Sequence, residues 1–190
     1  MPGKRSRRGL EAESWAFALK VYEQPRVAES CLALQAEAGV DVIVLLFAAF
    51  AAVRRQVLLD PSDLAEIDSI CSPWREQVVR PLRAFRVALK SGPSPAPNRM
   101  TERLRSKIKA SELSAERIQN DLLLDYLRLK APQHRPATPE DVRAVLRSVV
   151  MLALQDKDSG HIVAHLSDID EIAEAASRLR TDSRPIEDIG

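Results

Sequence analysis

The chain has 190 residues, of which 45% are hydrophobic, so it is long enough to enclose the core of one domain. Its 28 Lys and Arg residues nearly balance its 27 Asp and Glu residues, and a net charge of +1 gives no overall field that would attract nucleic acid or a membrane surface. The presence of only six glycines, with neither GxGxxG nor GxxxxGK[ST], argues against a glycine-rich phosphate loop and against a turn-rich β protein.

The first 13 residues are predicted to form a disordered basic tail, because chain ends fray unless packing anchors them. Its charge comes from Lys4, Arg5, Arg7 and Arg8. The first helix is expected to begin at Ser14, which can cap it, and to end at Pro25. Its predicted buried stripe is Trp15, Leu19 and Tyr22. A second helix is predicted over residues 27–38, before Gly39, with an inward stripe of Val27, Cys31, Leu34 and Ala38.

The most apolar stretch runs without interruption from Val42 to Val53, with Asp41 before it and Arg54 and Arg55 after it. A helix needs about 20 apolar residues to cross a bilayer, so this run is too short to span one. It also lies too far from the N-terminus to be a secretory signal. Its β-branched residues leave a buried strand as the competing interpretation, but its length and its alanine-rich second half favour a helix. We therefore predict a central helix over residues 41–55 that is buried on every side.

Two further helices are predicted before residue 91. A short one follows Pro61, with Ser62 or Asp63 as its cap, and the next starts or kinks near Pro81. Five residues of the latter are predicted to face one way: Trp74, Val78, Leu82, Phe85 and Leu89. Residues 91–98 (SGPSPAPN) then have the composition of a linker.

A long helix is predicted over about residues 101–129, with apolar residues that alternate at spacings of four and three. These residues are Leu104, Ile108, Ala115, Ile118, Leu122 and Leu129. Polar Ser111 and Asp125 occupy the two remaining positions of the series. The spacing is compatible with the seam of an intermolecular coiled coil, but the two polar positions favour packing within the same chain.

Two more helices are predicted beyond a second proline-rich break at residues 131–139, over about residues 140–155 and 167–179. Ser167 and Asp170 resemble a capping box at the start of the last helix. We therefore expect a helical domain over residues 14–130 and a proline-flanked C-terminal helical extension over residues 131–190, packed as a satellite.

Two pairs of side chains are candidates for a metal site. Asp121 and Asp125 lie one turn apart on the long helix, an arrangement in which aspartates can hold Mg²⁺ on a diphosphate, although the second acidic helix that such a site needs is missing. His161 and His165 have the spacing of the HExxH zinc motif, but Ile162 stands where the motif has Glu. Both ligand sets are incomplete, and we predict no catalytic residue and no cofactor.

Two basic helix surfaces are candidates for nucleic-acid contact. The first comprises Arg75, Arg80, Arg83, Arg86 and Lys90, and the second Arg99, Arg103, Arg105, Lys107 and Lys109. Acidic neighbours dilute both surfaces and no aromatic residue is interleaved to stack bases, so solvated surfaces are favoured. Cys31 and Cys71 form no CxxC pair and have no nearby basic cluster, which indicates reduced, buried thiols in a cytoplasmic protein.

The stretch WAFALKVYEQPRVAESCLALQAEAGVDVIVLLFAAFAA resembles the uncharacterised proteobacterial helical proteins grouped as domain of unknown function 2390. The resemblance continues more loosely to Leu129. It rests on residues that include Trp15, Phe17, Tyr22, Pro25, Cys31, Gly39, Asp41, Phe47, Trp74 and Pro81. Where such proteins have Asn near position 43 or 44 and Trp near 50, this chain has Ile43, Val44 and Phe50. The resemblance implies an all-helical fold in a bacterial cytoplasm, and it implies no activity, substrate or catalytic residue.

The sequence therefore predicts an all-α helical bundle around a buried central helix, with a long amphipathic helix lying across it. The function we expect is that of a non-enzymatic interaction or regulatory module, with a protein partner or a second copy bound through the long helix and no contact with a membrane. A Mg²⁺-dependent diphosphate-binding enzyme or ligand binder that uses Asp121 and Asp125 is the first alternative. Nucleic-acid contact through the basic helices is the second.

Overall fold

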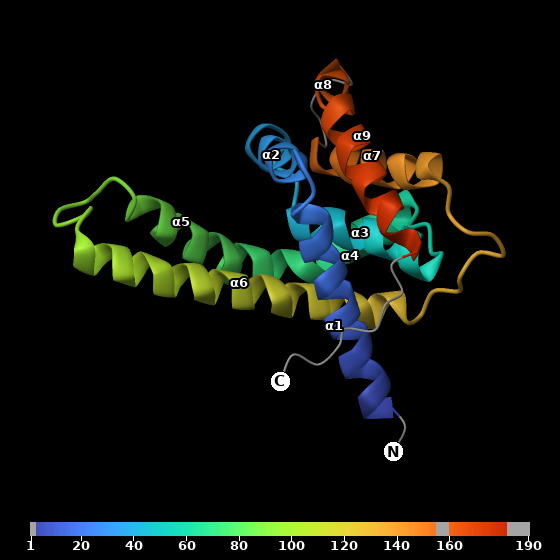
Figure 1. Cartoon of the computed structure of the whole chain (residues 1–190), viewed down its shortest axis with the longest axis horizontal. Helices are drawn as coiled ribbons and strands as arrows, with labels where there is room; N and C mark the ends of the chain where they lie inside the picture. Colours follow the sequence, from blue (N-terminus) through green and yellow to red (C-terminus); the bar gives the residue numbers. More distant parts are fainter. Residues whose placement is uncertain (1–2, 155–159, 182–190) are drawn as a thin grey trace.

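The computed structural model describes residues 3–154 and 160–181, and every regular element in these two ranges is a helix or a helical turn (Figure 1). The all-α fold predicted from the sequence is confirmed. None of the helices in these ranges is both long enough and apolar enough to span a membrane.

The centre of the fold is α3 (Val42–Arg55), the helix predicted from the apolar run. Its residues 44–53 are all buried, which confirms a core helix without a solvent-facing side. Asp41 caps it, since its Oδ1 accepts hydrogen bonds from the backbone N–H of Ile43 at 2.9 Å and of Val44 at 3.3 Å. These bonds satisfy two of the N–H groups that a helix start leaves without an intrahelical partner.

The first two helices pack on α3, and the structure corrects the prediction for one of them. α1 (Gly3–Tyr22) begins before Ser14, so it includes residues of the predicted basic tail. Its inward residues are Phe17, Ala18 and Val21, whereas the side chains of the predicted stripe are partly exposed. Ser14 does not cap the helix, because it is buried and its hydroxyl donates to Oδ1 of Asn120 at 2.9 Å.

The second helix confirms its predicted stripe. α2 (Val27–Ala33) passes into a π-helical turn, η1 (Leu34–Ala38), and stops at Gly39, whose φ of 74° is the left-handed conformation that glycine adopts readily. The four stripe residues are at most 1% exposed: Val27, Cys31, Leu34 and Ala38.

A helical rod follows, made of α4 (Pro61–Trp74), the π-helical turn η2 (Arg75–Val79) and α5 (Arg80–Ala88). Its cap is Asp60 instead of Ser62 or Asp63. Asp60 and Asp63 form a reciprocal capping box, with Asp63 at the third helical position. No residue of α5 is buried, and Phe85, one of the five residues predicted to face one way, is 66% exposed.

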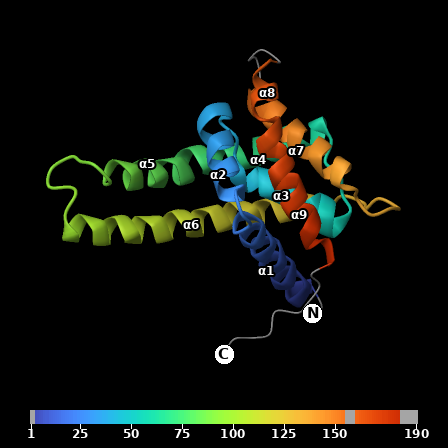
Figure 2. The same cartoon turned by 45° about the horizontal axis from the view of Figure 1, so that its top comes forward.

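The long helix α6 (Arg99–Leu127) packs against this rod, and the predicted linker joins the two. α5 and the first part of α6 extend away from the other helices, as both views show (Figures 1 and 2). We call residues 80–110 the arm. Ion pairs hold its base together, from Arg83 to Glu112 at 2.8 Å and to Glu116 at 2.6 Å, and from Arg86 to Glu112.

The C-terminal helices are part of the main core, so their predicted satellite packing is wrong. α7 (Pro139–Leu154) packs on α3, and α9 (Leu166–Arg178) packs on α2 and α7, with the short helices α8 (Gly160–Ala164) and η3 (Leu179–Thr181) beside them. Four of their apolar residues are fully buried in the same cluster as α3: Val142, Leu146, Ile169 and Ile172. His165 takes the N-cap position that was predicted for Ser167. The division of the chain at residue 131 stays a prediction.

Candidate functional site

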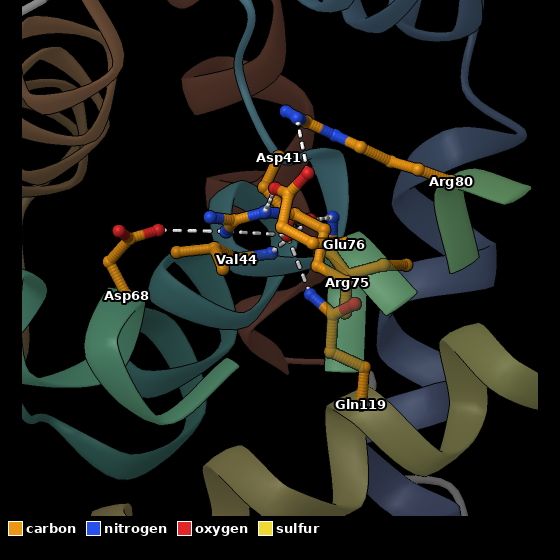
Figure 3. Close-up of polar contacts among 8 residues, drawn as sticks. Asp41, Val44, Asp68, Arg75, Glu76, Arg80 and Gln119 are labelled. Carbon is orange, nitrogen blue, oxygen red and sulfur yellow. Dashed lines mark hydrogen bonds and ion pairs between the residues drawn. The ribbon is translucent and has the colours of Figure 1, made fainter. Parts of the chain in front are cut away.

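A polar network surrounds the carboxylate of Asp41 at the start of α3 (Figure 3). While Oδ1 caps the helix, Oδ2 accepts hydrogen bonds from Nη1 of Arg75 at 3.2 Å and from Nε2 of Gln119 at 2.6 Å. Arg75 also donates to Asp68 at 2.7 Å. The side chains of Asp41 and Arg75 are only 12% and 14% exposed, so a nearly buried ion pair joins the start of α3 to η2, and the hydrogen bond from Gln119 adds α6.

The network continues outward along the rod. Nε of Arg75 pairs with Glu76 at 3.2 Å, and Glu76 pairs with Arg80 at 2.7 Å. Burial opposes the charge of Arg75, but the hydrogen bond to Asp68 and the charge of Asp41 outweigh it and raise the pKa of this guanidinium. Arg75 therefore stays charged in the folded protein, and its charge is balanced by carboxylates.

A second cluster lies at the base of the arm, where Glu112 and Glu116 face Arg83 and Arg86. Burial raises the pKa of Glu112, but hydrogen bonds from Arg86 and Arg83 outweigh it and bring the pKa below the ordinary value. Burial also raises the pKa of Glu116, and Arg83 offsets this only in part, so that pKa stays above the ordinary value. The two carboxyl groups share Arg83 and still differ in the direction of their shifts.

These opposite shifts predict opposite pH effects on stability. A carboxyl group with a lowered folded pKa stabilises the protein above its unfolded pKa, and this contribution is lost as the pH falls through the folded pKa. Glu112→Gln should therefore lower the free energy of unfolding by about 2 kcal/mol at neutral pH, and the difference from the wild type should shrink in acid. Glu116 has a raised folded pKa, so the cost of Glu116→Gln should instead grow in acid. Urea denaturation of both variants across a pH series measures this, and parallel pH profiles would contradict it.

Two cavities lie beside these clusters. The larger, about 420 Å³, is lined mainly by apolar side chains of α1, α2 and α3, together with the charged residues at the base of the arm, and we call it the apolar chamber. Trp15, Leu19 and Tyr22, the predicted buried stripe of the first helix, line this chamber instead of the core. The smaller, about 250 Å³, is lined by Asp41, Gln119 and three arginines, and we call it the polar chamber.

The aspartate pair predicted for Mg²⁺ lies on α6, outside both chambers. Asp125 is exposed and pairs with Arg128 at 3.0 Å, and Asp121 is half-buried. Among the described residues, no group of three or more His, Cys, Asp or Glu side chains is placed to hold a metal ion. The Mg²⁺ site stays a prediction that needs ligands beyond these two.

The histidine pair is only partly described. His165 is 5% exposed at the start of α9, with Nδ1 3.7 Å from Oδ2 of Asp168, whereas the side chain of His161 lies outside the described part of the chain. Both cysteines are buried and free, as predicted, and burial raises the pKa of each thiol to about 12. Neither thiol is activated as a nucleophile.

The arm concentrates the basic residues singled out for nucleic-acid contact. Nine of the chain's 28 Lys and Arg residues lie in residues 80–110, against one of its 27 Asp and Glu residues. Four of these arginines nevertheless pair with glutamates inside the chain: Arg80, Arg83, Arg86 and Arg105. Much of the positive charge is thereby neutralised, so nucleic-acid contact stays an alternative.

The sequence did not reveal the residues that the site depends on most. Asp41 was noted only as the residue before the apolar run and among those that carry the family resemblance, and Arg75 only as one member of a basic surface. Gln119 carried no signal at all, because it joins Asp41 across 78 positions of sequence.

Comparison with known proteins finds one relationship. Residues 13–123, more than half of the chain, match the family described as protein of unknown function (DUF2390). No curated protein and no solved structure matches this chain.

Proposed function

The chain belongs to this family of unknown function, and we propose that it is a non-enzymatic interaction module that pairs with a second copy of itself along α6. The observation that carries the proposal is a stripe of exposed apolar side chains on that helix. Met100, Leu104, Ile118 and Leu122 are 79%, 49%, 47% and 38% exposed, and we call them the α6 stripe. They recur at helical spacing on one side of the helix.

The α6 stripe is long enough to serve as a helix-docking surface. It extends over most of a 29-residue helix, and the first part of this helix belongs to the arm that projects from the other helices (Figure 2). Helices with apolar residues at spacings of three and four pair side by side by inserting these residues between those of a partner helix. The stripe consists of two apolar pairs, Met100 with Leu104 and Ile118 with Leu122, and each exposed pair is favoured in contact with a partner rather than with water.

Charges beside the α6 stripe support a second copy of the chain as the partner. Three positions after Met100 and Leu104, on the arm, lie two exposed basic residues, Arg103 and Lys107. The residues three positions after Ile118 and Leu122 are Asp121 and Asp125. An antiparallel alignment that sets Arg103 opposite Asp125 also sets Lys107 opposite Asp121, with the twofold axis beside Ser114. A second copy of α6 therefore provides a complementary charge at each end, as a self-complementary twofold interface requires.

Sedimentation equilibrium of the full chain tests this proposal. The wild type should form dimers, and Ile118→Glu with Leu122→Glu should weaken the dimer by at least about tenfold, because two charges would enter its apolar contact. Both residues are already exposed, so the double variant should keep its melting temperature. Met151→Glu is the matched control, since Met151 is 46% exposed on α7 and its replacement should leave the dimer intact. A wild type that stays monomeric at high concentration contradicts the proposal.

A further inference from the structure

The apolar chamber and the polar chamber adjoin, since Gln35, Val42, Ile43 and Arg83 line both. Small-molecule sites are typically concave and mostly apolar, with a few polar groups that fix the orientation of the ligand. The joined chambers fit this description, with aromatic and aliphatic side chains at one end and guanidinium groups at the other. A ligand that fills both would have an apolar body and a polar head.

Gln119, which lines the polar chamber, has an acceptor that the fold leaves unused. Its side chain is nearly inaccessible, with the residue 1% exposed, and its Nε2 donates to Oδ2 of Asp41. Oε1 of the same amide is buried and finds no hydrogen-bond partner among the described residues. Since buried polar atoms are almost always hydrogen-bonded, an N–H or O–H donor in the polar chamber, which Gln119 lines, would satisfy this oxygen.

Two arginines that line the polar chamber have donors to spare. Arg80 uses Nη1 to bind Glu76, and Arg83 uses Nε and Nη2 to bind Glu112 and Glu116. A guanidinium carries five N–H donors, so each side chain keeps N–H groups that these glutamates do not take. Planar pairs of N–H groups match the two oxygens of a carboxylate.

We propose that the joined chambers bind an amphipathic carboxylic acid whose head also carries an N–H donor, as in an N-acyl amino acid. The carboxylate binds Arg80 and Arg83, and the amide N–H donates to Oε1 of Gln119. The acyl chain lies in the apolar chamber against Trp15 and Leu46. This site goes beyond the proposed function, because no residue of the α6 stripe lines either chamber.

Calorimetric titration of the full chain with three probes tests this site. The probes are N-octanoylglycine, octanoic acid and octanol, which share an alkyl chain and differ in the head. N-octanoylglycine should bind about tenfold more tightly than octanoic acid, because its amide N–H offers Gln119 a donor that the ionised octanoate lacks. Octanol, which lacks the carboxylate, should bind more weakly than either acid. No binding of N-octanoylglycine, or equal affinity for all three probes, overturns the proposal and leaves water as the partner of Gln119.

Two variants locate the binding. Gln119→Leu should remove the preference for N-octanoylglycine over octanoic acid. Because this change also removes a bond to Asp41, Arg80→Gln provides a second test at a side chain that is 56% exposed and does not bind Asp41. It should weaken both acids several-fold and leave octanol unchanged, whereas Arg147→Gln, at an exposed arginine of α7 outside both chambers, should leave all three affinities unchanged. Full affinity for both acids in Arg80→Gln overturns the proposed orientation of the ligand.

Discussion

Leu45→Asp is expected to unfold the protein. Leu45 is 0% exposed in the middle of α3 and lines neither chamber, so a carboxylate at this position would have no access to water and no charged partner. Loss of the leucine contacts alone would cost about 2–5 kcal/mol, and the buried charge adds several more. Because domains of this size are stable by only about 5–15 kcal/mol, the total should exceed the stability of the fold. Circular dichroism and thermal melting measure the loss directly.

The control for this change is Val87→Asp, which places the same charge at an apolar residue that is 53% exposed on the arm and lies outside the α6 stripe. It should shift the free energy of unfolding by less than about 0.5 kcal/mol, because surface substitutions away from packed contacts have small effects. A folded Leu45→Asp protein that melts like the wild type would show that α3 is not the centre of the core.

Asp41→Ala should have the second-largest effect, a loss of about 3–4 kcal/mol of folding free energy. The change removes the cap of α3, which is worth about 1 kcal/mol, and it leaves the nearly buried Arg75 without one of its carboxylates. It also leaves Nε2 of Gln119 without its acceptor. Chemical denaturation in urea at neutral pH would measure the loss.

A double-mutant cycle separates the cap from the ion pair. Arg75→Ala alone should also destabilise, since it removes the partner of Asp41 and of Asp68. In the double variant the two losses should be less than additive, because the same contact is removed only once. Strict additivity would mean that Asp41 and Arg75 do not stabilise each other.

The helices that the sequence predicted well are those with local signals. The run from Val42 to Val53 is apolar at every position, so no choice of face was needed. Gly39 and the proline-rich linker marked the ends of helices by backbone chemistry alone. These features depend on residues close together in the chain, which periodicity and turn chemistry can detect.

The predictions that failed depend on contacts between distant segments. Ser14 is a residue type that often caps helices, but its hydroxyl donates a hydrogen bond to Asn120 on α6. The sequence near residue 14 gives no sign of that distant partner. The stripe of Trp15, Leu19 and Tyr22 has helical spacing, yet these residues line a chamber, because the core lies on the neighbouring side of α1. Helical spacing of apolar residues identifies the apolar side of a helix. It does not distinguish a side that packs in the core from one that lines a cavity.

The candidate site could not be predicted either, because it also depends on contacts between distant segments. Asp41, Arg75 and Gln119 come from three elements, and only the packing of α6 across α3 brings them together. In contrast, the 4-3 spacing of the long helix was visible in the sequence. Its interpretation changed only when four of its side chains and their neighbour Met100 were found exposed: Leu104, Ile118, Leu122 and Leu129.

The measurement that tests the central claim most directly is the distance between two copies of α6 in the dimer. Spin labels are attached to the cysteine of Ser114→Cys or of Met100→Cys, while the native cysteines are buried. Antiparallel pairing about Ser114 predicts a short distance between labels at position 114. It predicts a distance of about 40 Å at position 100, since 14 residues of helix, or about 21 Å, separate each label from the axis. Short distances at both positions would indicate parallel pairing, and no dipolar coupling at either position would contradict pairing along α6.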